Sequence, residues 1–406
     1  MSNIVYLSLP AHGHVNPTLP VVQELVQRGE QVTYYSASEF CPQIERTGAT
    51  FRAYPITEMT STAFSAILQD GNLALVVRLL LHTTEQLLPF LLDELSREQP
   101  DLVVFDSNAL WGNMAATLLK LRPAASIPHL VFDGTEARKA PHARQQIFRL
   151  LPMVPDLLSV RRRLIRRYGK AAFPSSRPLF PMRGGLNIVF TSRELNPDVP
   201  LIDQTFRFVG PSINPQTRDG DFPFDALGLQ PVVYISLGTV HSTRSEFYRQ
   251  CFEAFAGYPA QFILSAGTHT DIKELGAIPP NFIVCPFVPQ LEVLQRVDAF
   301  ITHGGLNSIH EGLYYGVPLI LIPQQLEQFL NAKAVAARGA GLVINDQLMH
   351  GHVRASTLHQ AAEVILADPR YREAAGALQK TLHTAGGYRQ AADEIQRYLA
   401  REGVQT

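Results

Sequence analysis

The stretch "IVYLSLPAHGHVNPTLPVVQELVQRGEQVTYYS", residues 4–36, decides the fold class. It opens with a short, β-branched apolar run, which is typical of a strand buried on both faces of a parallel sheet. Asn16 can cap a helix whose first turn holds Pro17, and Gly29 ends that helix before "QVTYYS", residues 31–36, which is expected to be a second strand. The stretch therefore predicts a strand, a helix and a second strand.

The same alternation continues through the first half of the chain. A helix to about Thr47 and the strand "TFRAY" (50–54) complete a βαβαβ unit, which implies a parallel, right-handed α/β sheet. Further strands are expected at "DLVVFD" (101–106), "HLVFD" (129–133) and "LNIVFTS" (186–192).

A linker is expected in the middle of the chain, because residues 196–230 are rich in Pro, Gly and Asp and show no periodicity. Strand patterns then restart in "PVVYISLGT", "AQFILSAGT", "NFIVCPF", "DAFITHGG", "VPLILIP" and "AGLVI". We predict an amino-terminal lobe over 1–205, a linker over 206–229, a second lobe over 230–385 and a last helix over 386–406. The two doubly wound, Rossmann-like lobes are expected to face a cleft, and the last helix to pack back towards the first lobe.

The bulk composition is typical of a globular protein with two or three domains, since the chain has 406 residues, 46% of them hydrophobic and 17% charged. A formal net charge of -1 gives no electrostatic case for nucleic acid as a partner. Cys41, Cys251 and Cys285 are widely spaced, so neither a disulfide framework nor a cysteine metal site is expected.

Targeting and membrane segments are not expected either. The amino-terminal stretch lacks a basic region followed by a cleavable apolar segment. No run reaches the ~18 apolar residues of a membrane-spanning helix, because "LALVVRLLL" is short and is interrupted by Arg78. The expected location is the cytoplasm.

The densest cluster of unusual residues is "HGGLNSIHEGLYYGVPLILIPQQLEQ", residues 303–328. Gly304 and Gly305 directly follow an expected strand and allow close backbone approach, and the amides of the next helix favour an anion such as phosphate. A plain strand-to-helix turn would explain the glycines alone. It would not explain the polar side chains beside them, which are His303, Asn307, Ser308 and Glu311.

With this cluster the sequence resembles the bacterial macrolide and flavonoid branch of the family 1 UDP-glycosyltransferases, relatives of the plant secondary-product glucosyltransferases. The resemblance runs nearly end to end and is carried by "AHGHVNPTLPVVQELVQRG", "PDLVVFD", "VYISLGT", "VPQLEVL" and the 303–328 signature. It implies the two-lobed GT-B fold and the transfer of a hexose, with glucose expected, from a UDP-sugar to a hydrophobic, hydroxylated acceptor. The UDP-sugar is a co-substrate, so no cofactor and no metal is expected.

The resemblance also implies a donor site in the second lobe. The diphosphate would be held by His303, Gly304, Gly305, Asn307 and Ser308, with Ser236, Gly238 and Thr239 approaching from a facing loop. Glu311 would take the ribose hydroxyls, and the uracil would meet Phe287, Val288 and Gln290. Phe287 stands where many relatives have tryptophan, and a phenyl ring can still stack on a base. Glu327 and Gln328 would contact the sugar, although many relatives have aspartate in place of Glu327.

Two histidines, His12 and His14, flank Gly13 after the first expected strand. An alcohol that attacks an anomeric carbon must lose its proton, and imidazole is the commonest general base for that step. The resemblance implies that His14 is the base and that Asp106 orients it, as the carboxylate does in a Ser-His-Asp relay. The field of the helix expected after Asn16 would help to keep His14 neutral.

The neighbouring polar groups have simpler interpretations. A lone loop histidine is more often structural than catalytic, and His12 is therefore expected to support the loop or to line the acceptor site. Asp133 is expected to be solvated or to cap a turn. Asp219 and Asp221 form a DxD, but they lie in the expected linker and follow no strand, so solvation is favoured over a metal.

The acceptor pocket is expected among apolar side chains of the first lobe, each of which could equally belong to the core. The candidates are Met59, Phe64, Trp111, Phe132 and Phe148. The basic run "RRRLIRRYGK" (161–170) is interpreted as a solvated helix face, with contact to an anionic membrane as the alternative that is not favoured.

Two other functions remain as alternatives at this stage. The same fold could host a UDP-sugar epimerase or hydrolase, or a non-catalytic nucleotide-sugar sensor. A nicotinamide-dependent dehydrogenase is disfavoured, because no GxGxxG follows the first expected strand.

Overall fold

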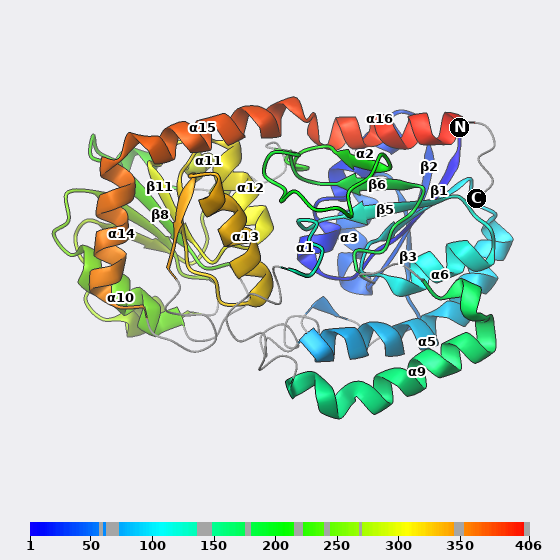
Figure 1. Cartoon of the computed structure of the whole chain (residues 1–406). Helices are drawn as coiled ribbons and strands as arrows, with labels where there is room; N and C mark the ends of the chain where they lie inside the picture. The colour runs from blue at the N-terminus through cyan, green and yellow to red at the C-terminus, as the bar shows by residue number, and fades with distance from the viewer. Residues whose placement is uncertain are drawn as a thin grey trace. The chain divides into compact units, whose positions relative to one another are not determined.

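The fold is described from a computed structural model, in which the chain forms two compact units (Figure 1). It describes residues 1–56, 60–61, 73–135, 148–174, 180–214, 222–238, 244–267, 270–344 and 353–401, with Leu73 and Arg244 described by their backbone alone. Unit 1 comprises residues 1–213 and 385–406, and unit 2 comprises residues 214–384.

Unit 1 contains a seven-stranded parallel sheet, as the α/β prediction required. In spatial order its strands are β3 (Thr50–Ala53), β2 (Gln31–Ser36), β1 (Asn3–Leu7), β4 (Leu102–Asp106), β5 (Pro123–Ile127), β6 (Leu186–Val189) and β7 (Phe206–Phe208). The strand order reverses next to β1, which is the switch point where open α/β sheets bind ligands at the carboxyl ends of their strands.

Two strands of this sheet differ from the sequence-based expectation. The strand next to β4 is "PAASI", residues 123–127, and the more apolar "HLVFD" (129–133) is the connection that follows it. A central strand buried on both faces can consist of small residues, so hydrophobicity alone pointed to the wrong segment. The expected linker was also placed too early, because β7 extends the sheet at residues 206–208.

Helices cover both faces of the sheet in unit 1 (Figure 1). The helices are α1 (His12–Val15), α2 (Leu19–Gln27), α3 (Cys41–Glu45), α5 (Leu73–Glu98), α6 (Leu110–Leu118), α9 (Val154–Tyr168) and α16 (Gly387–Ala400), with short 3-10 turns η1 (Ser38–Phe40), η2 (Leu151–Met153) and η3 (Lys170–Ala172). Alternate residues of β1 face opposite sides of the sheet. Val5 and Leu7 pack with α5, α6 and α9, whereas Ile4 and Tyr6 pack with α2, α3 and α16.

The helix predicted to end at Gly29 is present as α2, but its start was placed too early. Residues 12–15 form the one-turn helix α1, and α2 starts only at Leu19, with Thr18 as its N-cap and Pro20 in its first turn. Asn16 is the C-cap of α1 and caps no following helix.

Helix α5 is longer than the sequence suggested. Its segment Ala74–Glu98 is long and apolar enough to span a membrane by length and composition. Leu87, Leu88, Leu91 and Leu95 are nevertheless fully buried in the unit 1 core, where α5 packs against α6 and α9. These contacts account for the apolar composition as that of a core helix.

The basic run 161–170 lies mainly on α9. Val160 and Leu164 of this helix are buried, whereas Arg162 and Arg166 are exposed. Arg163 is ion-paired with Glu85 at 2.6 Å. The arginines thus lie on the exposed face of a helix whose apolar stripe is buried, as a solvated helix face requires.

Unit 2 contains a six-stranded parallel sheet in the order β10-β9-β8-β11-β12-β13. All six strands were expected from the sequence: β8 (Val232–Ser236), β9 (Gln261–Ser265), β10 (Phe282–Cys285), β11 (Ala299–Thr302), β12 (Leu319–Leu321) and β13 (Gly341–Val343). Its helices are α10 (Arg244–Phe255), α11 (Gln290–Leu294), α12 (Leu306–Tyr314), α13 (Leu326–Ala337), α14 (Ala355–Ala367) and α15 (Pro369–Thr384), with 3-10 turns η5 (Phe224–Ala226) and η6 (Ile272–Leu275).

The last helix, α16, belongs to unit 1, although α15 directly before it belongs to unit 2. Gly386 adopts a left-handed backbone (φ 91°) between the two helices. Ala391, Ala392 and Ile395 are fully buried against α2 and the sheet. Arg122 fastens the other end, donating to the carbonyl oxygens of Tyr398, Leu399 and Arg401 at 2.8–3.0 Å.

Candidate active site

The structure joins His14 and Asp106 at the carboxyl edge of the unit 1 sheet. β1 and β4 are neighbours, so the segment after β1 and the last residue of β4 meet at that edge. His14 Nδ1 lies 2.7 Å from Asp106 Oδ2, and the second carboxylate oxygen accepts the Asn108 amide at 2.8 Å. Asp106 is 3% exposed and His14 21% exposed, so the carboxylate is enclosed while the ring reaches solvent.

This geometry determines how the His14 ring can act. The Asp106 carboxylate accepts a hydrogen bond from Nδ1–H, which leaves Nε2 as the nitrogen that can take a proton from another molecule. The expected field of a helix capped at Asn16 plays no part, because His14 lies inside α1 and α2 begins later. The tautomer is instead set by Asp106.

The other candidates near this edge have separate partners. The exposed His12 ring lies edge-on to Phe40, with ring centroids 5.0 Å apart, which is consistent with loop support. Asp133 accepts the Thr135 amide at 2.9 Å and its hydroxyl at 2.6 Å, so it caps a turn as expected.

In unit 2 the loops after β8 and β11 come together around His303. Gly238 has a φ of +72°, and a Cβ built on it would lie 2.7 Å from His303 Cε1. A Cβ on Gly305 would lie 2.5 Å from His303 Nε2. Glycine is therefore needed at both positions because the imidazole packs directly on the backbone.

The polar signature follows at the start of α12. Its N-cap is Gly305, which has no side chain to cap the first amides of the helix. Asn307 and Ser308 are half-buried in the first turn, and Ser236 is half-buried at the end of β8, the neighbour of β11. The side chains and the free amides of this helix end are hydrogen-bond donors, and together they suit an anion.

Glu311 lies one turn further along α12 and is 4% exposed. Gln290, the first residue of α11, donates from Nε2 to Glu311 Oε2 at 2.5 Å. Gln290 was expected at the uracil and Glu311 at the ribose, and the two side chains are hydrogen-bonded to each other.

The remaining residues that were expected to bind the UDP-sugar differ in their exposure to solvent. Phe287 is 63% exposed, as a ring that stacks on a ligand can be, whereas Val288 is buried. Glu327 is exposed in the first turn of α13. Gln328 is buried, and its Oε1 accepts the amide of Gln324 at 2.9 Å, so at least part of this side chain holds its own loop.

One of the residues predicted to line the acceptor pocket lies in the core of unit 1. Trp111 is fully buried, donates from Nε1 to the Tyr54 hydroxyl at 3.2 Å and belongs to the unit 1 core, so its assignment as a pocket wall was wrong. Phe132 is half-buried and Phe148 is 70% exposed. Met59, Phe64, Thr239 and the DxD at 219–221 lie outside the described residues.

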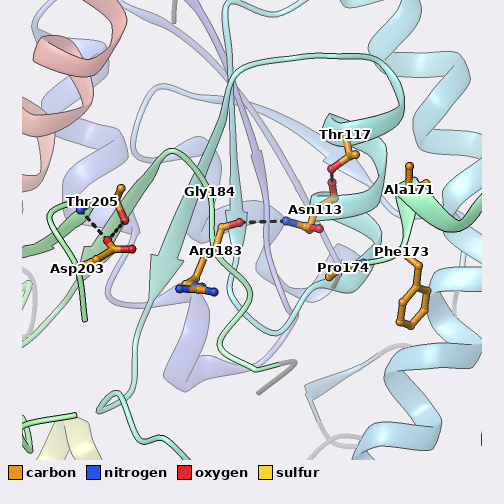
Figure 2. Close-up of a pocket in the computed structure, with 10 residues that line it drawn as sticks. Asn113, Thr117, Ala171, Phe173, Pro174, Arg183, Gly184, Asp203 and Thr205 are labelled. Atoms are coloured by element: carbon orange, nitrogen blue, oxygen red, sulfur yellow. Dashed lines mark hydrogen bonds between the residues drawn. The ribbon is translucent and has the colours of Figure 1, made fainter. Parts of the chain in front are cut away.

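A recess of about 350 Å³ lies at the opposite edge of the unit 1 sheet (Figure 2). Asn113 and Thr117 of α6 and Arg183, Gly184 and Thr205 line it, and Asn113 donates to the Arg183 carbonyl. Gly184 packs on Pro123, the first residue of β5, which is the amino end of that strand. The recess is therefore remote from His14 and Asp106.

Sequence reasoning missed Tyr234 and Asn331. Tyr234, two residues before Ser236 on β8, donates to Gln290 Oε1 at 2.9 Å. The fully buried Asn331 of α13 donates to the Gly304 carbonyl at 3.3 Å and so ties the glycine turn to α13. The available signal was a polar side chain within an otherwise buried apolar segment.

Across the described ranges, no group of three or more His, Cys, Asp and Glu side chains is arranged to hold a metal ion.

Two parallel-sheet units with these sites define a glycosyltransferase of the GT-B fold. Residues 212–385 match the family described as "UDP-glucoronosyl and UDP-glucosyl transferase". The chain is 32% identical to the UDP-glucosyltransferase YojK of Bacillus subtilis, itself described as uncharacterized, over 97% of each chain. It is 30% identical to the oleandomycin glycosyltransferase of Streptomyces antibioticus, over 98% of this chain and 91% of the relative.

A solved glycosyltransferase structure is also similar to this chain over nearly its full length. The glycosyltransferase of kitacinnamycin is 29% identical and superposes with a TM-score of 0.81, covering 98% of this chain and 99% of the other. The protein belongs to the family 1 UDP-glycosyltransferases and is an enzyme. The alternative of a non-catalytic sensor is thereby set aside.

Proposed function

We propose that this enzyme transfers glucose from UDP-glucose to a hydroxyl group of a hydrophobic small molecule, with inversion at the anomeric carbon. The observation that carries the proposal is the His14–Asp106 pair, whose Nδ1 and Oδ2 atoms lie 2.7 Å apart with the carboxylate buried. A neutral imidazole fixed in this way is a general base for a hydroxyl proton.

The reaction is a single displacement. As the acceptor oxygen bonds to the anomeric carbon, its proton passes to His14 Nε2, and the bond from that carbon to the diphosphate oxygen breaks. UDP leaves with the electron pair of the broken bond. Asp106 stabilises the imidazolium that forms and does not itself take the proton.

The donor is assigned to unit 2. His303 and the first amides of α12, with Asn307 and Ser308, would hold the diphosphate, and Glu311 would bind the ribose. The charge that develops on the leaving UDP is then stabilised by imidazole, amides and the helix end. We therefore expect transfer without a divalent cation, so that EDTA leaves the rate unchanged.

The choice of substrates follows from the named relatives. YojK is named as a UDP-glucosyltransferase, which favours UDP-glucose. The other two relatives are named for oleandomycin and kitacinnamycin, which favours a hydroxylated natural product as acceptor. Flavonoids, simpler phenols and macrolides are the classes to try first.

The test is incubation with UDP-glucose and a panel of these acceptors, followed by mass spectrometry. A product heavier by one hexose, with an anomeric configuration opposite to that of the donor, supports the proposal. UDP binding without a glycosylated product from any acceptor would sink it, and free glucose released without an acceptor would favour the hydrolase instead.

Two variants then test the base. His14→Ala should lower kcat by roughly 10³-fold and Asp106→Asn by roughly 10²-fold, because both impair proton removal in the transition state. The Kd for UDP should stay unchanged in both. Equal loss of UDP binding would show that the residues are structural. His12→Ala is the matched control, expected to retain most of the activity.

A further inference from the structure

A chain of hydrogen bonds runs through unit 2 from Tyr234 to Glu311. The Tyr234 hydroxyl donates to Gln290 Oε1 at 2.9 Å, and Gln290 Nε2 donates to Glu311 Oε2 at 2.5 Å. The three residues come from β8, α11 and α12. Tyr234 and Glu311 are 1% and 4% exposed, so little water can replace these bonds.

The chemistry of an amide allows only one orientation of Gln290 in this chain. Its oxygen accepts and its nitrogen donates, and a carboxylate needs a donor. Burial and the charge of Glu311 raise the pKa of Tyr234, so its hydroxyl keeps the proton that it donates. A flipped amide would place Oε1 against the carboxylate and lose the hydrogen bond to Glu311, because both groups only accept.

The Tyr234 hydroxyl is not needed for packing. The ring stacks on Phe300 with centroids 4.7 Å apart and an angle of 17° between the planes, and a phenyl ring could make the same contact. The hydroxyl, which also interacts with Ser236 and Ser265, is a polar group whose burial costs free energy unless it is hydrogen-bonded.

We propose that Tyr234 is a positioning residue for the nucleotide: it fixes the Gln290 amide, which holds the Glu311 carboxylate ready for the ribose hydroxyls. This inference rests on the proposed donor role of Glu311. Tyr234 itself touches no substrate in this scheme and acts through Gln290.

Tyr234→Phe tests this with little change in shape. We expect the Kd for UDP, measured by calorimetry, and the KM for UDP-glucose to rise roughly 10-fold, as the loss of a hydrogen bond to a charged network allows. The kcat and the KM for the acceptor should change little. Tyr248→Phe is the matched control, because this buried tyrosine donates to the backbone carbonyls of Ser265, the last residue of β9, and of Ala266 after it.

A comparison of UDP with 2′-deoxy-UDP separates positioning from simple destabilisation. The wild type should prefer UDP, and Tyr234→Phe should reduce that preference by weakening UDP binding more than 2′-deoxy-UDP binding. Tyr248→Phe should leave the ratio of the two Kd values unchanged. In a Gln290→Ala background, Tyr234→Phe should leave the ratio of the two Kd values unchanged, because the other contact of the hydroxyl, with Ser236, bears on both nucleotides alike.

The outcomes distinguish this inference from the proposed function. If the wild type binds UDP and transfers glucose but Tyr234→Phe leaves the UDP to 2′-deoxy-UDP ratio intact, the positioning role is overturned and the transferase stands. If the wild type does not bind UDP, the proposed donor site fails, and the inference fails with it.

Discussion

At the scale of single residues, the chemistry depends on close approach between side chains and backbone. Asp106 can hold His14 because its other oxygen is bound by the Asn108 amide, so the carboxylate cannot rotate freely. His303 is confined by Gly238 and Gly305, where any Cβ would collide with the ring. The two glycines thus determine where the His303 ring can lie.

Gly238→Ala tests this confinement. The added Cβ meets the His303 ring, and the φ of +72° also costs an alanine about 1 kcal/mol of stability. We expect UDP affinity to fall roughly 10-fold, since His303 must move. Gly257→Ala is the control, because Gly257 has a φ of +73° but nothing within 4 Å of an added Cβ. Equal effects on UDP affinity would mean that contact with His303 is unimportant.

His310 provides a test by pH. Burial lowers its pKa to about 3, from an ordinary value of 6.5. Between these two pH values only the unfolded chain binds a proton at His310. The stability that the folded state gains from keeping His310 neutral is therefore complete above pH 6.5 and is lost as the pH falls. Acidification from pH 7 to pH 5 should therefore lower the free energy of unfolding by about 2 kcal/mol through His310.

The measurement is urea unfolding of the wild type and of His310→Gln at both pH values. The variant should lose less stability on acidification than the wild type. His383→Gln, at an exposed histidine of the same unit, should behave like the wild type. Identical pH dependence in wild type and His310→Gln would show that His310 does not govern acid sensitivity.

At the scale of elements, a helix is identified by what it packs on more than by its composition. Helix α5 is apolar enough to resemble a membrane span, yet its leucines fill the core of unit 1. Helix α16 is held differently, by buried alanines along its length and by Arg122 at its carboxyl end. Arg122 satisfies carbonyl groups that the end of any helix leaves without intrahelical partners.

Arg122→Met should therefore loosen the end of α16. The methionine keeps an apolar stem but loses three hydrogen bonds to carbonyl oxygens, and we expect unfolding to become easier by about 1–2 kcal/mol. Hydrogen exchange should rise in residues 395–401. Arg166→Met, at an exposed arginine of α9, is the control and should change neither quantity. Unchanged exchange in Arg122→Met would contradict the role assigned to Arg122.

At the scale of the whole molecule, the chain returns to its first unit at its carboxyl end. Residues 385–406 belong to unit 1, so the amino-terminal unit is built from two separate parts of the sequence. The free energy of α16 packing therefore stabilises the unit that carries His14 and Asp106, although α16 directly follows a helix of unit 2.

Deletion of residues 385–406 should consequently affect the two units unequally. We expect calorimetry to show that unit 1 unfolds at a lower temperature than in the wild type. Unit 2, whose unfolding temperature UDP should raise under the proposed function, should unfold near its wild-type temperature. Ile395→Ala, which removes part of a fully buried side chain, should lower the same transition by a smaller amount. An equal loss in both transitions would mean that α16 stabilises the two units alike.

Much of the fold could be predicted from local patterns. Apolar strand runs, glycines after helices and the change of composition near residue 200 are local features, and they indicated two parallel-sheet lobes and most of their strands. The prediction failed at β5 and at the start of α2, because small strand residues and a one-turn helix leave little trace in hydrophobicity. It failed at Trp111 because a large apolar side chain looks the same in a core as in a pocket.

The sequence by itself determined the chemical types of the site: a histidine after β1, a carboxylate ending β4 and a polar signature after β11. Only the tertiary structure decided which of these groups touch. Parallel pairing of β1 with β4 brings His14 to Asp106 across a separation of 92 residues, and the folding of β8, α11 and α12 brings Tyr234, Gln290 and Glu311 into hydrogen-bond distance of one another. Contacts of this kind depend on strand order and on the exclusion of water, and neither is a property of a local stretch of sequence.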